Sequence, residues 1–168
     1  MTQKRNLPCF ILARGGSKGL KKKNLYNFLN KPLISHTINY AKKCKLISHV
    51  VVSTDDKEIF EFCKKLHCET IYPRPKKLSN DNSRSISALL HAANEYEKRF
   101  GDFDIFAFMQ ATEPLRPKNI LTKCINLLLR NKKLNSAFAA YEYKKNFLFW
   151  CSICNIFNLT LNIPWYKI

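Results

Sequence analysis

The residues best suited to chemistry form a glycine-rich, basic loop near the N-terminus. Three of the four glycines in this 168-residue chain, at positions 15, 16 and 19, lie within five residues. Glycines let backbone amides approach an anion closely, and successive amides form an anion-binding concavity. Five cations surround them: Arg14, Lys18, Lys21, Lys22 and Lys23. The pattern predicts a triphosphate site, where fixed positive charge offsets the charge that develops when the α-phosphorus is attacked.

Two familiar nucleotide-binding motifs do not fit this loop. The dinucleotide fingerprint requires G-x-G-x-x-G, whereas the order here is G-G-S-K-G. The Walker A pattern G-x-x-x-x-G-K-[ST] is also absent. The alternative interpretation is a basic turn between a strand and a helix, and the loop by itself leaves both interpretations open.

The segments around the loop indicate the elements that position it. Apolar runs of strand length occur at residues 9–13, 50–52, 68–72, 104–109 and 136–141. The alternation of these runs with helical patterns predicts a three-layer, Rossmann-like α/β fold with a mainly parallel sheet. Four predicted helices have these apolar lines at helical spacing: Leu33, Ile34, Thr37, Ile38 and Ala41; Ile59, Cys63 and Leu66; Ile86, Leu89, Leu90 and Ala93; Ile120, Cys124, Leu127 and Leu128.

The loops that follow the strands should carry the site. In parallel α/β sheets, ligands bind beyond the carboxyl ends of the strands. In the second of these loops, Asp55 and Asp56 are expected to cap the following helix rather than to act as catalytic carboxylates. The loops of interest start after Ala13, Ser53, Tyr72 and Met109.

Charge and cysteine content narrow the functional classes. The net charge of +17 would attract anionic partners. The lysines are spread over many segments instead of one face with interleaved aromatic residues, so we expect no nucleic-acid partner. The seven scattered cysteines, including the isolated pair Cys151 and Cys154, are expected to be reduced and mostly buried. No run reaches about 18 uninterrupted apolar residues, which predicts no membrane span and a cytoplasmic location.

Five motifs, in order, resemble the acylneuraminate cytidylyltransferase (CMP-sialic acid synthetase) family. The first is the loop followed by Lys23 and Asn24, similar to the family signature A-R-x-G-S-K-x(n)-K-N. The resemblance covers roughly residues 8–145 and implies a nucleotide-diphospho-sugar transferase version of the α/β fold. The other motifs are K-P-L-I-S at 31–35, V-V-V-S-T-D-D at 50–56, R-P at 74–75 with L-S-N-D at 78–81, and Q-A-T-E-P-L-R at 110–116.

The resemblance implies an enzyme that joins CTP to a nonulosonic (sialic-type) acid, forming a CMP-sugar and pyrophosphate. It assigns catalytic roles to Arg14, which would hold the phosphates, and to Lys23, which would stabilise charge at the α-phosphate. Within the same loop region it implies nucleotide contacts for Ala13, Gly16, Ser17 and Asn24.

Further positions receive roles from the resemblance. Arg74 and Ser83 match positions that help to select cytosine and ribose, and Gln110 lies on the loop that faces the sugar acid. Arg116 is expected to order that loop more than to contact a ligand. The four histidines match no family motif and are expected to be structural: His36, His49, His67 and His91.

The fifth motif departs from the family pattern at two positions. Ala111 replaces a usual proline, which loosens the loop. Glu113 replaces a usual serine and places a carboxylate near an anionic sugar, where it is open to binding a cation or an amino-sugar substituent. The family uses Mg²⁺ and forms homodimers, but its acidic metal pair is not found here, since Glu142 is the only acidic residue after Glu113. No metal ligand is therefore assigned.

Residues 147–168 differ in character from the rest of the chain. They are aromatic, contain no acidic residue and lack a period of 2 or 3.6. We interpret residues 1–146 as a partial CTP-binding cytidylyltransferase domain and residues 147–168 as an atypical hydrophobic tail, expected from a truncation or a shifted reading frame near Asn146. Three functions follow: a cytidylyltransferase, a catalytically dead nucleotide-binding remnant and, less favoured, a basic nucleic-acid-binding protein.

Overall fold

The central strand of the sheet is β1 (Cys9–Leu12), whose apolar side chains are buried on both faces. In this computed structural model, which describes residues 5–17, 19–139 and 155–158, β1 pairs in parallel with β4 (Val50–Ser53) and with β6 (Ile105–Gln110). β5 (Glu69–Ile71) extends the sheet in parallel beyond β4. Continuous apolar runs are typical of such doubly covered parallel strands.

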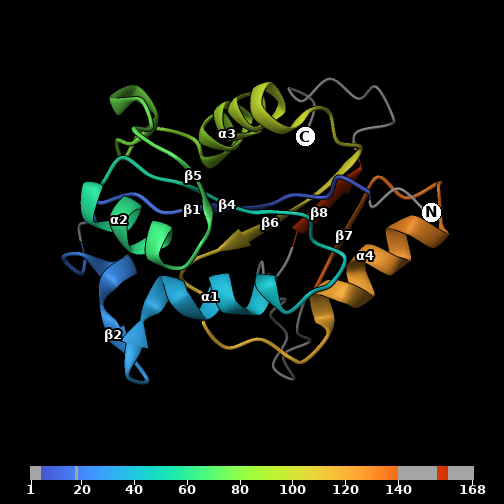
Figure 1. The fold of residues 1–168 in the computed structure, drawn as a ribbon, viewed down its shortest axis with the longest axis horizontal. Coiled ribbons are helices and arrows are strands. Elements are labelled where there is room, and N and C mark those ends of the chain that lie inside the picture. Colours follow the sequence, from blue (N-terminus) through green and yellow to red (C-terminus); the bar gives the residue numbers. More distant parts are fainter. Residues whose placement is uncertain (1–4, 18, 140–154, 159–168) are drawn as a thin grey trace, which may run out of the picture.

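At the other edge of the sheet, a strand comes from residues 147–168, which the sequence predicted to be an atypical hydrophobic tail. β8 (Asn155–Asn158) comes from this segment and lies between β6 and β7 (Ser136–Phe138), antiparallel to both. The order is β5-β4-β1-β6-β8-β7 (Figure 1). The sequence pattern missed β8 because Asn155 and Asn158 leave only two apolar residues between them, and backbone pairing with two neighbouring strands places it. The mainly parallel sheet is confirmed, while the domain division at residue 146 stays a prediction.

Helices cover both faces of the sheet, as expected for a three-layer fold. α1 (Leu33–Lys42), α2 (Lys57–Lys65) and α4 (Ile120–Arg130) pack on one face. α3 (Ser85–Phe100) packs on the other (Figure 1). Each face has its own core because successive side chains of a strand point to opposite sides. In β1, for example, Ile11 belongs to the first core and Phe10 to the second.

The buried faces of two helices are rotated from the predicted lines. In α3, Ile86 is 38% exposed, and the buried residues are Ala88, Leu89, Ala92 and Tyr96. In α4, Leu127 is 52% exposed, and the buried residues are Leu121, Cys124, Ile125 and Leu128. The α3 prediction omitted Tyr96, whose ring packs edge-on against Phe10 at 5.8 Å between centroids. That aromatic contact with β1 sets which side of α3 faces the sheet.

The cysteines and two of the histidines within the described residues have structural surroundings. Five cysteines, at positions 9, 44, 63, 68 and 124, are free and buried, as predicted. Cys151 and Cys154 lie outside the described residues. His36 Nε2 donates to the Phe28 carbonyl at 2.7 Å, and His49 Nδ1 bonds to the Tyr96 hydroxyl at 2.6 Å. In the part of the chain that the structure describes, no helix is both long and apolar enough to span a bilayer.

Candidate active site

A polar cleft of about 380 Å³ lies at the carboxyl ends of β1 and β6. It is the place that the topology predicts, because the loops after neighbouring parallel strands meet at one edge of the sheet. The loops after β1, β5 and β6 all contribute. Seven of the nine predicted site residues line this cleft: Arg14, Ser17, Lys23, Asn24, Arg74, Ser83 and Gln110.

Arg14 is positioned in the cleft from two sides. Its guanidinium forms an ion pair with Asp81 at 2.8 Å, and both side chains are partly exposed. Its carbonyl accepts a hydrogen bond at 2.9 Å from the amide of Asn24, a buried residue of the short 3-10 helix η1 (Lys23–Leu25). Asn24 therefore fixes the backbone from which Arg14 projects, and its amide and Lys23 line the same cleft.

Arg74 is a buried cation that also lines the cleft. Its side chain is only 3% exposed. Its Nε donates to the Ser79 hydroxyl at 3.1 Å, and a terminal nitrogen lies 3.6 Å from Asp55 Oδ1. Burial lowers the pKa of the Arg74 guanidinium, whereas the charge of Asp55 raises it and that of Arg14 lowers it. Asp55 is thus the counter-charge that a buried cation requires.

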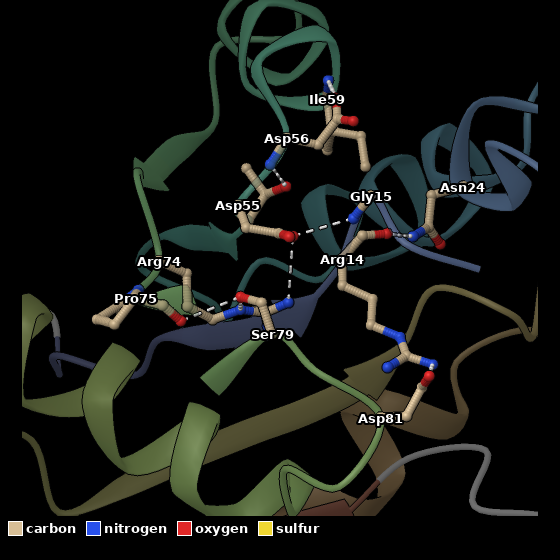
Figure 2. A network of polar contacts seen from close by, with 11 residues as sticks. Arg14, Gly15, Asn24, Asp55, Asp56, Ile59, Arg74, Pro75, Ser79 and Asp81 are labelled. Carbon is tan, nitrogen blue, oxygen red and sulfur yellow. Dashed lines mark hydrogen bonds and ion pairs between the residues drawn. The ribbon is translucent and has the colours of Figure 1, made fainter. Parts of the chain in front are cut away.

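The two aspartates that were expected to cap α2 have different roles. Asp56 is the N-cap, since its carboxylate accepts from the Ile59 amide at 2.9 Å. The expectation for Asp55 was wrong, because its carboxylate points away from the helix and accepts from the Gly15 amide at 3.0 Å (Figure 2). Asp55 is the third residue of the S-T-D-D turn, and the loop after β1 lies against its side chain.

The glycines of the loop do not all serve close approach to an anion. A Cβ at Gly15 would lie 2.5 Å from the Asp56 carboxylate, so this glycine is needed for packing against the loop after β4. Its amide is already bonded to Asp55. Gly16 and Gly19 have no atom within 4 Å of such a Cβ. The concave anion site predicted from successive amides therefore does not include the Gly15 amide.

Two predicted site residues do not line the main cleft. Ala13 is buried in the core, and its amide donates to the Ser53 carbonyl at 3.0 Å. Gly16 lines a smaller adjoining hollow, together with Arg14, Ser17 and Asp81. Their contacts with a nucleotide stay predictions.

Of the five cations predicted to surround the glycine-rich loop, two line the cleft of the folded chain. Arg14 and Lys23 line the cleft. Lys22 instead binds the Glu58 carboxylate at 2.6 and 2.8 Å, and this hydrogen bond raises the pKa of Lys22. Lys21 is exposed and is not among the lining residues, and Lys18 lies outside the described residues. The site charge therefore comes mainly from arginines and Lys23.

Arg116 orders the loop between β6 and α4, as predicted. Its buried guanidinium donates to the Thr37 hydroxyl at 2.9 Å and to the Gln110 carbonyl at 2.7 Å. Glu113 lies 3.8 Å from the same guanidinium, which gives this carboxylate a protein partner. Glu113 is not among the residues that line the cleft. The replacement of a usual serine by Glu113 thus adds to the internal ordering of the loop.

Several residues that line the cleft had no role predicted from the sequence. Asp81 was part of a motif, but its pairing with Arg14 required the fold. The fourth and fifth motifs also contain these lining residues: Leu78, Asn80, Ala111 and Thr112. The remaining lining residues come from β1, β6, α3 and the turn before α3, which meet only in the folded chain: Leu12, Arg84, Ser85, Ala88 and Phe108.

The described residues do not fit a magnesium site. Among them, no group of three or more histidine, cysteine or acidic side chains could hold a metal ion. The one described carboxylate that lines the cleft, Asp81, is paired with Arg14. Protein-bound Mg²⁺ usually needs one or two carboxylates beside the substrate phosphates. The Mg²⁺ expected from the sequence stays a prediction.

Comparison with known families matches residues 9–147 to the Cytidylyltransferase family. The chain belongs to this family. The resemblance predicted from the five motifs is confirmed, and the homologues in this family are nucleotidyltransferases.

Individual relatives are named for pseudaminic acid and for N,N'-diacetyllegionaminic acid. The chain is 35% identical over 136 residues to the pseudaminic acid cytidylyltransferase of Campylobacter jejuni strain 81-176, covering 81% of this chain and 58% of that protein. It is 34% identical over 107 residues to the CMP-N,N'-diacetyllegionaminic acid synthase of Campylobacter jejuni, covering 63% and 46%. The chain thus spans about half the length of these relatives.

Solved structures share the fold. The CMP:2-keto-3-deoxy-manno-octonic acid synthetase complexed with CTP has a TM-score of 0.67 at 23% identity, covering 79% of this chain and 51% of that one. A cytidylyltransferase from Leptospira borgpetersenii also has a TM-score of 0.67, at 22% identity, covering 94% and 62%. At these identities the likeness concerns the fold, and it confirms the predicted Rossmann-like α/β class.

Proposed function

We propose that this chain binds CTP in the cleft and supports transfer of its cytidylyl group to a nonulosonic acid. One observation carries the proposal: in a chain of the cytidylyltransferase family, Arg14, Lys23 and Arg74 line a single polar cleft at the carboxyl edge of the sheet. In the reaction, a hydroxyl of the sugar acid attacks the α-phosphorus, and the bond to the leaving pyrophosphate breaks. The products are a CMP-sugar and pyrophosphate.

The residues that line the cleft have different proposed roles according to their positions. Arg14 and Lys23 provide fixed charge for the phosphates, which is effective because preorganised cations need no rearrangement as charge develops. Asn24 holds the Arg14 backbone, and Ser17 lies beside it. Arg74 and Ser83 occupy the side of the cleft proposed for cytosine and ribose. Gln110, whose loop is ordered by Arg116, would face the sugar acid.

The sugar acid is proposed at the level of the class. Relatives named for pseudaminic, legionaminic and N-acylneuraminic acids all match this chain. Pseudaminic acid is the first substrate to test, because that name belongs to a relative that aligns with 81% of the chain. Mg²⁺, a homodimer and a cytoplasmic location remain predictions from the sequence.

The proposal is tested by titrating the purified chain calorimetrically with CTP and with ATP, at about 150 mM salt and with Mg²⁺ present. We expect CTP to bind, ATP to be silent and Arg14→Ala to abolish the heat. Glu58→Gln, which removes the exposed partner of Lys22 outside the cleft, is the matched control and should bind CTP normally. Equal binding of CTP and ATP would contradict the proposal.

Turnover is measured separately, as pyrophosphate released from CTP in the presence of pseudaminic, legionaminic or N-acetylneuraminic acid. Release with one of these acids, and none without it, would support the enzyme. CTP binding without release would identify the chain as a nucleotide-binding remnant. Binding that falls steeply with salt and does not distinguish bases would instead indicate non-specific nucleic-acid affinity.

A further inference from the structure

The Asp55 carboxylate joins three loops around the cleft. Asp55 itself follows β4, and its Oδ1 accepts the amide of Gly15, which follows β1, at 3.0 Å. The same oxygen lies 3.6 Å from the guanidinium of Arg74, which follows β5 (Figure 2). One oxygen atom therefore connects the loop that carries Arg14 with the side chain of Arg74.

Asp55 is placed to act through Arg74 rather than on a ligand. It is not among the residues that line the cleft, whereas Arg74 is. The Arg74 side chain is almost fully buried, and Asp55 is 26% exposed. A buried guanidinium adopts one orientation only when its charge and its donors are matched. Asp55 supplies the charge, and the Ser79 hydroxyl accepts from Nε at 3.1 Å.

We propose that Asp55 is a positioning residue for nucleotide recognition, which orients Arg74 toward the base and ribose while it anchors the phosphate loop at Gly15. This inference rests on the proposed function. It assigns two separable tasks to one carboxylate: the charge serves Arg74, and the acceptor oxygen serves the Gly15 amide. An asparagine retains an acceptor oxygen and loses the charge, so Asp55→Asn should impair the first task and leave the second.

Two probes separate the tasks. CMP carries the base and ribose with one phosphate, and inorganic tripolyphosphate carries only the phosphate chain. In calorimetric competition against CTP, Asp55→Asn should lower the affinity for CMP about three- to ten-fold, which is the scale of one weakened polar contact. Tripolyphosphate affinity should stay unchanged. Asp55→Ala, which removes the acceptor as well, should weaken both probes.

A matched control is available at the next position. Asp56→Asn makes the same change of charge, and asparagine is as good an N-cap as aspartate. Asp56 contacts the Ile59 amide instead of Arg74, so this variant should bind both probes as the unaltered chain does. Thermal unfolding of each variant verifies that it is folded.

The outcomes are distinct. Loss of CMP affinity in Asp55→Asn with tripolyphosphate retained supports the inference, and equal effects on both probes, or none, overturn it. If Asp55→Asn does not fold, Ser79→Ala decides, because it removes the Nε partner of Arg74 and, besides that, only the bond of Ser79 to the Pro75 carbonyl. Selective weakening of CMP binding supports the inference that Arg74 must be held in place, and unchanged CMP binding overturns it. If the unaltered chain binds neither CTP nor the probes, the proposed function itself fails.

Discussion

The Arg14 guanidinium and the Asp81 carboxylate lie 2.8 Å apart across the cleft. Arg14 comes from the loop after β1, and Asp81 lies between β5 and α3, so the ion pair connects these two segments at the site. If Arg14 binds a phosphate as proposed, that phosphate would compete with Asp81 for the guanidinium.

Replacing Asp81 should consequently strengthen CTP binding. Exposed ion pairs contribute about 0.2–1 kcal/mol. Asp81→Asn frees Arg14 from this pair and should increase CTP affinity by up to about five-fold, measured by calorimetric titration. Weaker binding in Asp81→Asn would contradict the competition and would indicate that Asp81 assists the ligand. Glu58→Gln, which breaks the ion pair of Lys22, serves as the control and should leave CTP affinity unchanged.

Gly15 should tolerate no side chain, whereas its neighbour should. A methyl group at Gly15 would lie 2.5 Å from the Asp56 carboxylate, and Gly16 has nothing within 4 Å. Gly15→Ala is expected to lower the free energy of unfolding by about 1–3 kcal/mol because overpacking forces backbone shifts. Gly15→Ala should also weaken CTP binding, since the loop that bears Arg14 must move. Gly16→Ala should stay within about 0.5 kcal/mol of the unaltered chain in urea unfolding; equal losses in both would refute this explanation.

Arg116 should stabilise the fold through the loop after β6. Its buried guanidinium bonds to Thr37 on α1 and to the Gln110 carbonyl. Arg116→Met removes charge-assisted hydrogen bonds and should cost about 2–3 kcal/mol in the free energy of unfolding. The exposed Lys118 in the same loop provides the control, and Lys118→Met should change stability by less than about 0.5 kcal/mol. A stable Arg116→Met chain would show that the loop is ordered by other contacts.

The stability of the fold should decline in alkali because of buried thiols. Burial raises the pKa of Cys63 to about 12 and that of Cys68 to about 11. In the unfolded chain a thiol ionises near pH 8.5. Above that pH the unfolded state has released a proton that the folded state retains, so the free energy of unfolding falls as pH rises from about 9 to 11.

A variant pair isolates this effect. Cys63→Ala removes the buried thiol of α2 and should make the loss of stability between about pH 9 and 11 shallower. Ile59→Val truncates another core residue of α2 without a titrating group, and should lower stability by a similar amount at every pH. Parallel pH profiles for Cys63→Ala and the unaltered chain would rule out the thiol as the cause.

The sequence determined much of the architecture because each apolar run has a local signature. Strand runs at 9–13 and 104–109 and the line of Ile34, Ile38 and Ala41 are read from neighbouring residues, and all became elements of the structure. The glycine-rich loop with Arg14 and Lys23 was also visible, since its glycines and cations are adjacent in the chain.

Only the tertiary structure decided the relationships between distant loops. No local pattern predicts that Asp55 turns from α2 to the Gly15 amide, or that Asp81 pairs with Arg14, because these partners are tens of residues apart and meet only after the strands align. The same reason explains β8, which has only two apolar residues between Asn155 and Asn158 and is placed by hydrogen bonding between β6 and β7. The residue types of the candidate site are therefore visible in short segments of the sequence, whereas their relative positions depend on the packing of the sheet.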